Sequence, residues 1–288
     1  MKRILAPLIF GALFALSTLT AFAVVDGQDA PRTPYMARLA VNGAVCGATL
    51  IDPQWALTAA HCIDPYINSL PITYTLTDIA QRTKIRIGEY DTSQHEDHER
   101  WINVTEIITF GYRFGHPAHH DIALIHLAET LTRTEFVDFA LLDTAPPAPG
   151  DPITIYGWGK QATQPRSPIL QIGQTNAGPT VWPFHFLTRT GARIAPGDSG
   201  GPAVSQNGAI TGIASASNSN TSYYTTIAPY HRQIEEAINA HSRNDAPHHD
   251  PDPCPPDTIE IEPGNCLEFE EGHFAPVFLP VVHGGPLT

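Results

Sequence analysis

The chain has 288 residues, of which 42% are hydrophobic, and a formal net charge of −13 at pH 7. This length accommodates one large all-β domain or two small ones, and the apolar content is too high for a disordered chain. The negative charge argues against nucleic acid as a partner, since little in the chain would neutralise phosphates. Four cysteines are too few for a disulfide-dense scaffold, and they lack zinc-ligand spacing.

Residues 1–23 are typical of a secretory signal peptide. Lys2-Arg3 precedes a mostly apolar run from Ile4 to Thr20, and Ala21-Phe22-Ala23 has the small-x-small pattern of a cleavage site. The apolar run is short for a membrane span, and we expect no span elsewhere. We therefore expect export to an oxidising compartment, extracellular or periplasmic, where disulfides form. Local pairing then joins Cys46 to Cys62 and Cys254 to Cys266.

Short alternating apolar segments, separated by turn residues, follow residue 24 and predict β-strands. In the first half these segments are Tyr35 to Val41, Ala48 to Ile51, Lys84 to Ile87, Trp101 to Ile108 and Ile122 to Leu127. A proline-rich stretch at 145–150 links them to a second half. There the segments are Pro152 to Trp158, Ile169 to Gln174, Pro202 to Val204, Ala209 to Ala214 and Tyr223 to Ile227.

The composition then changes twice. Ile234, Ala237 and Ile238 recur at helical spacing, which predicts a helix over 229–241. Residues 242–288 form a proline-rich, acidic extension that cannot be a buried strand or helix near its start. Within the extension, Phe274 to Val282 is apolar enough for a strand or a docking segment.

Three residues together indicate nucleophilic chemistry. Alone, His61 after an apolar strand is more often structural, Asp121 before a strand is an ordinary turn residue, and the Ser199 turn is an ordinary glycine turn. Together they change this interpretation, because serine is a poor nucleophile until a base takes its proton. A histidine can do so, and a buried carboxylate fixes its tautomer.

Three motifs resemble the signatures of trypsin-like (chymotrypsin-fold) serine proteases. They are Thr58-Ala-Ala-His-Cys62, Asp121-Ile-Ala-Leu124 and Gly197-Asp-Ser-Gly-Gly-Pro202, in that order along the chain. The resemblance spans 24–241 and implies an all-β fold. Two six-stranded antiparallel β-barrels, at about 24–140 and 150–230, would hold the active site between them, followed by the helix.

The resemblance also assigns roles. It implies that His61 is the general base and acid, Asp121 its orienting partner and Ser199 the acylating nucleophile. The backbone N–H groups of Gly197 and Ser199 would form the oxyanion hole. Cys46–Cys62 matches a disulfide of the family, and the lack of one in the second barrel suits a bacterial origin.

Activation is expected to depend on the start of the mature chain. In this family a freed α-amino group, usually of Ile or Val followed by Val, pairs with the aspartate before the serine. Val24-Val25 resembles that sequence, and Asp198 is the matching acid. Cleavage immediately before Val24 would let signal peptidase create the activating terminus, without a separate propeptide. The alternative is that cleavage occurs nearby and Val24 only begins a first strand.

An acidic stretch over 89–99 resembles the calcium loop of trypsins, and calcium takes six to eight oxygen ligands. The resemblance implies side-chain oxygens from Glu89 and Glu99, main-chain carbonyls from Asp91 and Gln94, and Glu96 acting through a water molecule. The alternative is a solvated acidic loop. No cofactor is required, and a structural calcium ion is the one metal expected.

The substrate pocket departs from the trypsin pattern. Where trypsins keep an aspartate at the pocket base, counting back from the serine without gaps gives Arg193. Ser217 and Ser222 align where trypsins keep glycines, and Ser215 resembles the serine that bonds substrate backbone. A cationic base would repel lysine and arginine, so we expect acidic or small polar residues before the scissile bond. The alternative is a local gap, with Arg193 pointing to solvent.

The expected function is that of a secreted, monomeric serine endopeptidase acting on proteins or peptides. The alternative is a non-catalytic relative used for binding. The extension is expected to bind a surface or a secretion partner.

Overall fold

A computed structural model describes residues 24–115, 120–159, 168–181, 184–187, 191–242, 258–262, 265–268 and 282–283. The expected signal peptide and Cys254 lie outside these residues, and the side chain of Cys266 is not described. No helix within the described ranges is long and apolar enough to cross a membrane.

Six antiparallel strands close the first half into a barrel. They are β2 (Met36–Val41), β3 (Ala44–Asp52), β4 (Trp55–Thr58), β5 (Thr83–Ile87), β6 (Arg100–Thr109) and β7 (Ala123–Leu127). The pairing order is β3-β2-β5-β6-β7-β4, and β4 pairs back onto β3. Apolar side chains from these strands fill the interior, among them Leu39, Leu50, Ile85, Ile102 and Leu124.

Two departures from the expected first half have local causes. β3 begins at Ala44, four residues before the expected strand, because Ala44 to Gly47 are also buried and paired with β2. A short helix, α1 (Leu76–Ala80), was not expected. Thr75 and Asp78 cap it reciprocally, each side chain bonding the other residue's backbone N–H.

The second half is a separate antiparallel sheet. It contains β1 (Gln28–Asp29), β8 (Pro152–Gly157), β9 (Gln171–Val181), β10 (Phe184–Leu187), β11 (Pro202–Ser205), β12 (Ile210–Ser217) and β13 (Ser222–Thr226). The order is β1-β9-β10-β13-β12-β11-β8, and β8 also pairs with β9. A second cluster of buried residues, which includes Ile153, Ile155 and Tyr224, packs against this sheet.

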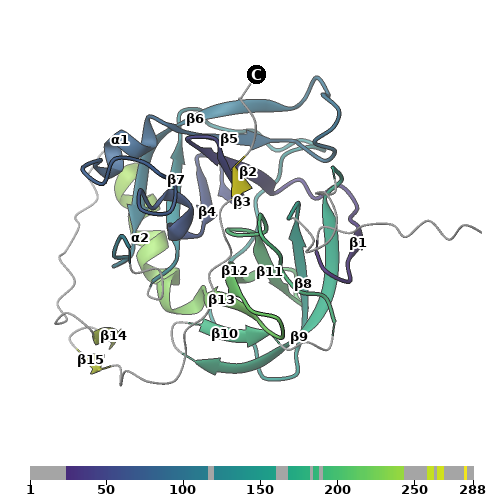
Figure 1. Cartoon of the computed structure of the whole chain (residues 1–288), viewed down its shortest axis with the longest axis vertical. Helices are drawn as coiled ribbons and strands as arrows, with labels where there is room; N and C mark the ends of the chain where they lie inside the picture. The colour runs from purple at the N-terminus through teal and green to yellow at the C-terminus, as the bar shows by residue number, and fades with distance from the viewer. Residues whose placement is uncertain are drawn as a thin grey trace, which may run out of the picture.

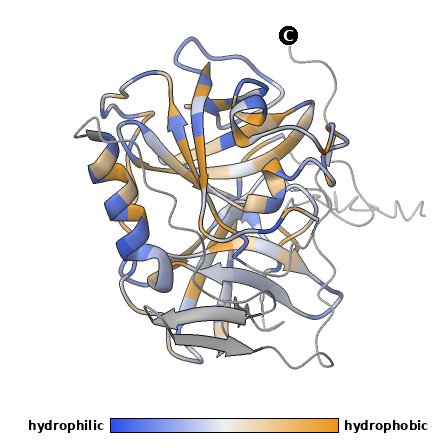
Figure 2. Cartoon of the chain, turned by 90° about the vertical axis from the view of Figure 1, so that its left-hand side faces the viewer, coloured by the Kyte–Doolittle hydropathy of each residue, from blue (hydrophilic) through white to orange (hydrophobic). Residues whose placement is uncertain are grey.

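The helix expected over 229–241 is confirmed, although it begins two residues later than expected. A 3₁₀ turn (Ala228–Tyr230) leads into α2 (His231–Ser242). Ile234 is fully buried and Ala237 nearly so, and both belong to the core cluster of the first barrel. The helix lies along one side of the molecule with polar residues on much of its visible surface (Figure 2). It therefore ties the end of the second half to the first barrel.

Two parts of the C-terminal extension form strands. β14 (Thr258–Glu262) and β15 (Asn265–Glu268) pair as an antiparallel hairpin. β16 (Val282–His283) pairs antiparallel with β3, with Val282 opposite Val45 and His283 opposite Ala44 (Figure 1, yellow). The extension thus returns to the first barrel. Of the apolar segment expected to be a strand or a docking segment, only Val282 lies within the described residues.

Candidate active site

The position of His61 is fixed by its local chain. β4 ends at Thr58, and a 3₁₀ turn (Ala60–Ile63) carries His61 into the interior. A disulfide joins the next residue, Cys62, to Cys46 on β3, as expected. The His61 backbone N–H donates to Asp121 Oδ1 at 2.7 Å, and its ring Nδ1 lies 2.8 Å from Asp121 Oδ2. Since an ionised carboxylate only accepts, Nδ1 is the donor of this bond.

Asp121 lies where the two halves of the molecule meet. Ser215 Oγ, from β12 of the second sheet, donates to Asp121 Oδ2 at 2.5 Å. Thr225 Oγ1, from β13, donates to the backbone carbonyl of Asp121 at 3.0 Å. The carboxylate, which is fully buried, therefore has three donors fixing its orientation, and two of these come from His61. The expected contact of Ser215 with substrate backbone stays a prediction, and its hydroxyl bonds this carboxylate.

The turn that carries Ser199 packs directly against the segments that lead to His61. Gly200 has a φ of +78°, and a Cβ there would lie 2.2 Å from Thr58 Oγ1 and 2.3 Å from the Gly47 carbonyl oxygen. Only glycine fits such a position. The Gly47 N–H donates to the Ser199 carbonyl at 2.7 Å. The tight contact brings the serine and histidine segments together.

The surroundings of the Ser199 hydroxyl are closed. Ser199 and His61 are both fully buried, with 0% of their surface exposed. Within the described residues, Ser199 Oγ has no hydrogen-bond partner. The backbone N–H groups of Gly197 and Ser199 donate to no group that the structure describes. These N–H groups keep their donor capacity for a bound oxygen, as an oxyanion hole requires.

Asp198 points away from the serine. Its carboxylate accepts hydrogen bonds from the N–H of Gly159 at 2.7 Å and of Ala195 at 2.8 Å. Gly159 must be glycine, since a Cβ would lie 2.5 Å from Asp198 Cγ. Val24 is fully buried in the apolar cluster of the second sheet. In this chain its nitrogen is a peptide nitrogen, so the expected ion pair between Val24 and Asp198 stays a prediction.

The residues expected to form the specificity pocket lie together. Arg193 pairs with Val25 through its backbone, and its guanidinium Nη1 donates to the Ser219 carbonyl at 3.3 Å. Ser217 and Ser222 are directly opposite on the β12–β13 hairpin, next to this loop. Ser222 Oγ accepts from the N–H of the residue after Arg193 at 3.0 Å. The Arg193 side chain thus contacts the backbone of the loop that joins β12 to β13.

The acidic loop is bound by arginines. Glu89 and Glu99 are buried, and both pair with Arg86, at 2.9 Å and 2.6 Å. Arg38 also pairs with Glu89. Burial raises the pKa of the Glu89 carboxyl, and the Arg38 and Arg86 guanidiniums oppose that rise.

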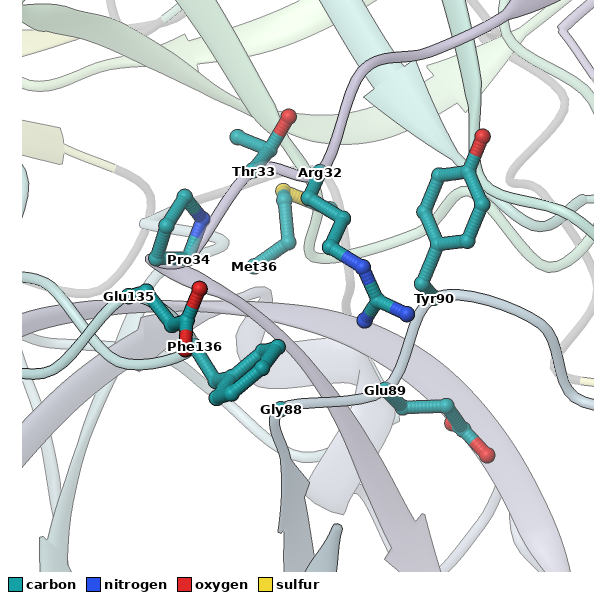
Figure 3. Close-up of a pocket in the computed structure, with 9 residues that line it drawn as sticks. All are labelled: Arg32, Thr33, Pro34, Met36, Gly88, Glu89, Tyr90, Glu135 and Phe136. Carbon is teal, nitrogen blue, oxygen red and sulfur yellow. The ribbon is translucent and has the colours of Figure 1, made fainter. Parts of the chain in front are cut away.

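Two further acidic residues of this loop, Asp91 and Glu96, also have partners. The other expected calcium ligands have different partners: Asp91 accepts from Ser93 and from the Gln94 amide, and Glu96 pairs with Arg32. The Arg32 guanidinium lies over the Tyr90 ring, 5.2 Å from its centroid (Figure 3). Since guanidiniums already neutralise the buried carboxylates, this donor set does not fit a calcium ion without rearrangement. Calcium binding stays a prediction that these contacts oppose.

The sequence analysis did not identify the arginines that pair with the glutamates of this loop. Arg38 and Arg86 are opposite each other on β2 and β5. A signal was present, since both are charged residues within alternating apolar strands. A largely buried charge needs a partner, and for Arg86 the acidic loop, which begins three residues later at Glu89, is the nearest source along the chain.

A buried histidine–aspartate pair, a serine on a tight glycine turn and a junction between two β-structures define the class of chymotrypsin-fold proteins. The model of the Trypsin family matches residues 24–234, and the chain belongs to this family. Human "Serine protease 1" is 28% identical over 230 residues, covering 73% of this chain and 86% of the relative. The trypsin of Squalus acanthias is 28% identical over 236 residues, covering 75% and 96%.

Solved structures agree on the fold. A mutant of human heparin binding protein aligns with a TM-score of 0.65 and 21% identity, covering 75% of this chain and 97% of that one. Mouse neuropsin, described as a serine protease, aligns with a TM-score of 0.63 and 23% identity, covering 75% and 100%. The range matched by the family model, residues 24–234, includes the candidate site.

Proposed function

We propose that the chain is a serine endopeptidase that hydrolyses peptide bonds through an acyl-enzyme on Ser199. The observation that carries the proposal is the His61–Asp121 pair, buried against the serine turn where the two halves meet. Family membership supports it. We infer in addition that the second sheet, whose β8 and β9 also pair, closes as a second barrel.

Each residue then has a defined step. His61 Nε2 takes the proton of Ser199 Oγ as that oxygen attacks the substrate carbonyl carbon. Asp121 holds the proton on Nδ1 and stabilises the imidazolium that forms. The N–H groups of Gly197 and Ser199 donate to the oxyanion, and each such donor is worth about 2.7–4 kcal/mol in the transition state. His61 then returns its proton to the leaving amine, and water hydrolyses the ester by the same steps.

We propose that export and activation are coupled. Signal peptidase would cleave after Ala23, and the new α-amino group of Val24 would pair with Asp198. Two features support this: Val24 is already buried in the second-sheet core, and Asp198 is fully buried and held by backbone N–H groups. A buried carboxylate gains most from a fixed cationic partner. N-terminal sequencing of the secreted protein tests the step, and a mature chain that starts elsewhere contradicts it.

We further propose a preference for acidic or small polar residues before the scissile bond. Arg193 at one end of the β12–β13 hairpin supports it, since its cationic side chain repels lysine and arginine.

Hydrolysis of a peptide library by the mature chain tests activity and preference together. Ser199→Ala should abolish cleavage. Ser205→Ala changes the last residue of β11, whose hydroxyl bonds the Ala209 carbonyl, and should retain cleavage. Equal cleavage by wild type and Ser199→Ala would contradict the proposal.

A further inference from the structure

Three side chains of types that ligate metal ions lie together where α2 packs on the first barrel. They are Glu106 on β6, His126 on β7 and His241 in the last turn of α2. One ligand atom from each lies within 4.8 Å of the others. Glu106 and His126 are paired directly across β6 and β7, and His241 Nδ1 lies 3.4 Å from Glu106 Oε2.

The hydrogen bonds of His126 leave one ring nitrogen ready for a ligand. His126 is 7% exposed, and its Nδ1 lies 2.6 Å from Thr105 Oγ1. The Thr105 hydroxyl donates to the His126 backbone carbonyl at 3.3 Å, so it accepts from Nδ1–H. Nε2 then carries a lone pair, and this buried atom has no hydrogen-bond partner among the described residues. A buried polar atom without a partner is costly, and a bound ion would remove that cost.

We propose that Glu106, His126 and His241 bind a divalent transition-metal ion of the zinc class. Imidazole nitrogens with one carboxylate oxygen suit zinc, whereas calcium and magnesium take oxygen ligands. Three protein ligands leave a fourth position for water. Thr105 acts as the outer partner that fixes the tautomer and orientation of a metal-bound histidine. The Trp55 ring, 4.4 Å from the His126 ring centroid and 5.3 Å from that of His241, covers one side.

The ion would clamp two parts of the molecule together. The strands β6 and β7 belong to the first barrel, whereas α2 follows the last strand of the second sheet. The ligand atoms must lie about 3.3–3.6 Å apart, because bonds of about 2.0–2.2 Å to a tetrahedral ion require this separation. His241 can move to reach this separation, because its side chain is 37% exposed at the helix end. The site therefore fixes α2 immediately before the C-terminal extension begins.

Titration of the chelator-treated full chain with Co²⁺ and Zn²⁺ tests this site. We expect one equivalent of Co²⁺ to give the visible absorption of a tetrahedral N/O site, Zn²⁺ to displace it, and Zn²⁺ to raise the melting temperature. His241→Ala and Glu106→Gln should each weaken Zn²⁺ binding by at least about tenfold. His231→Ala, on the same helix but outside the cluster, is the control and should bind as wild type.

Two results would overturn the assignment. One is the absence of stoichiometric binding by the wild type, or equal binding by all variants. The other is binding that survives in His241→Ala and Glu106→Gln but is lost in His61→Ala. Because metal content and absorption are read directly, neither result depends on proteolytic activity.

Discussion

The substitution Asp121→Asn tests how the aspartate acts on His61. Its Oδ1 accepts from the His61 backbone N–H, and its Oδ2 accepts from Nδ1 and from Ser215 Oγ. Asparagine has one oxygen for these two positions. If that oxygen keeps the backbone bond, the amide nitrogen faces Nδ1 at about the same 2.8 Å and donates to it. The proton then moves to Nε2, which can no longer accept from Ser199.

The expected cost follows from losing the base. We expect kcat/KM to fall about 10⁴-fold at neutral pH, equivalent to about 5.4 kcal/mol of transition-state stabilisation. The assay is steady-state hydrolysis of a peptide substrate found by library profiling, with the mature chain. Asp64→Asn, which removes another fully buried carboxylate that bonds Tyr112 and Gly115, should destabilise the fold but keep kcat/KM. Activity of Asp121→Asn within tenfold of wild type would refute this account of the pair.

Three further substitutions test the surroundings of the site. Gly159→Ala places a Cβ 2.5 Å from Asp198 Cγ, so urea unfolding should show a loss of about 1–3 kcal/mol and hydrolysis should fail; an unchanged midpoint would contradict this packing. Arg193→Gln should reduce the ratio of kcat/KM for glutamate over glutamine before the scissile bond by about tenfold or more, and an unchanged ratio would remove Arg193 from the pocket. In wild type, millimolar calcium should leave the melting temperature where a chelator leaves it. Arg86→Gln should lower it and make it respond to calcium; a clear calcium response of the wild type would show that an ion displaces the guanidiniums.

Two strands of the first barrel, β5 and the first part of β6, could be predicted because buried and more exposed residues alternate along them. In β5, Thr83, Ile85 and Ile87 are buried and Lys84 is exposed, so period-two patterning finds the strand. The strand β3 does not follow this rule at its start, since Ala44 to Gly47 are all buried, and Gly47 packs against the serine turn. Contacts with distant parts of the chain determine the length of β3, and the local sequence pattern does not reveal them.

The candidate site likewise combines residues that the sequence identified with partners that only the structure reveals. The motifs around His61 and Asp121 and their order along the chain suggested their roles, and the structure brings the two side chains within hydrogen-bonding distance. The partners of Asp121 could not be read from the chain, because Ser215 and Thr225 come from the second sheet, about 100 residues away. The same holds for the Glu106, His126 and His241 cluster, which exists only because α2 packs against the first barrel.

The acidic loop has contacts that the resemblance to a calcium loop does not reveal. Its residues match a calcium loop by type and spacing, yet each buried glutamate is paired with an arginine from a neighbouring strand. In this structure, arginine side chains of the same chain provide the positive charge beside the buried glutamates. Sequence alone identifies the negative charge but not what neutralises it.

The most direct test of the central claim is covalent labelling of the mature chain by a fluorophosphonate, carried to saturation and located by peptide mass spectrometry. The account predicts one adduct per chain, on Ser199, absent in Ser199→Ala and much slower to form in Asp121→Asn. Failure of the mature chain to label, or an adduct on any other serine, would contradict the claim that this chain is a serine endopeptidase.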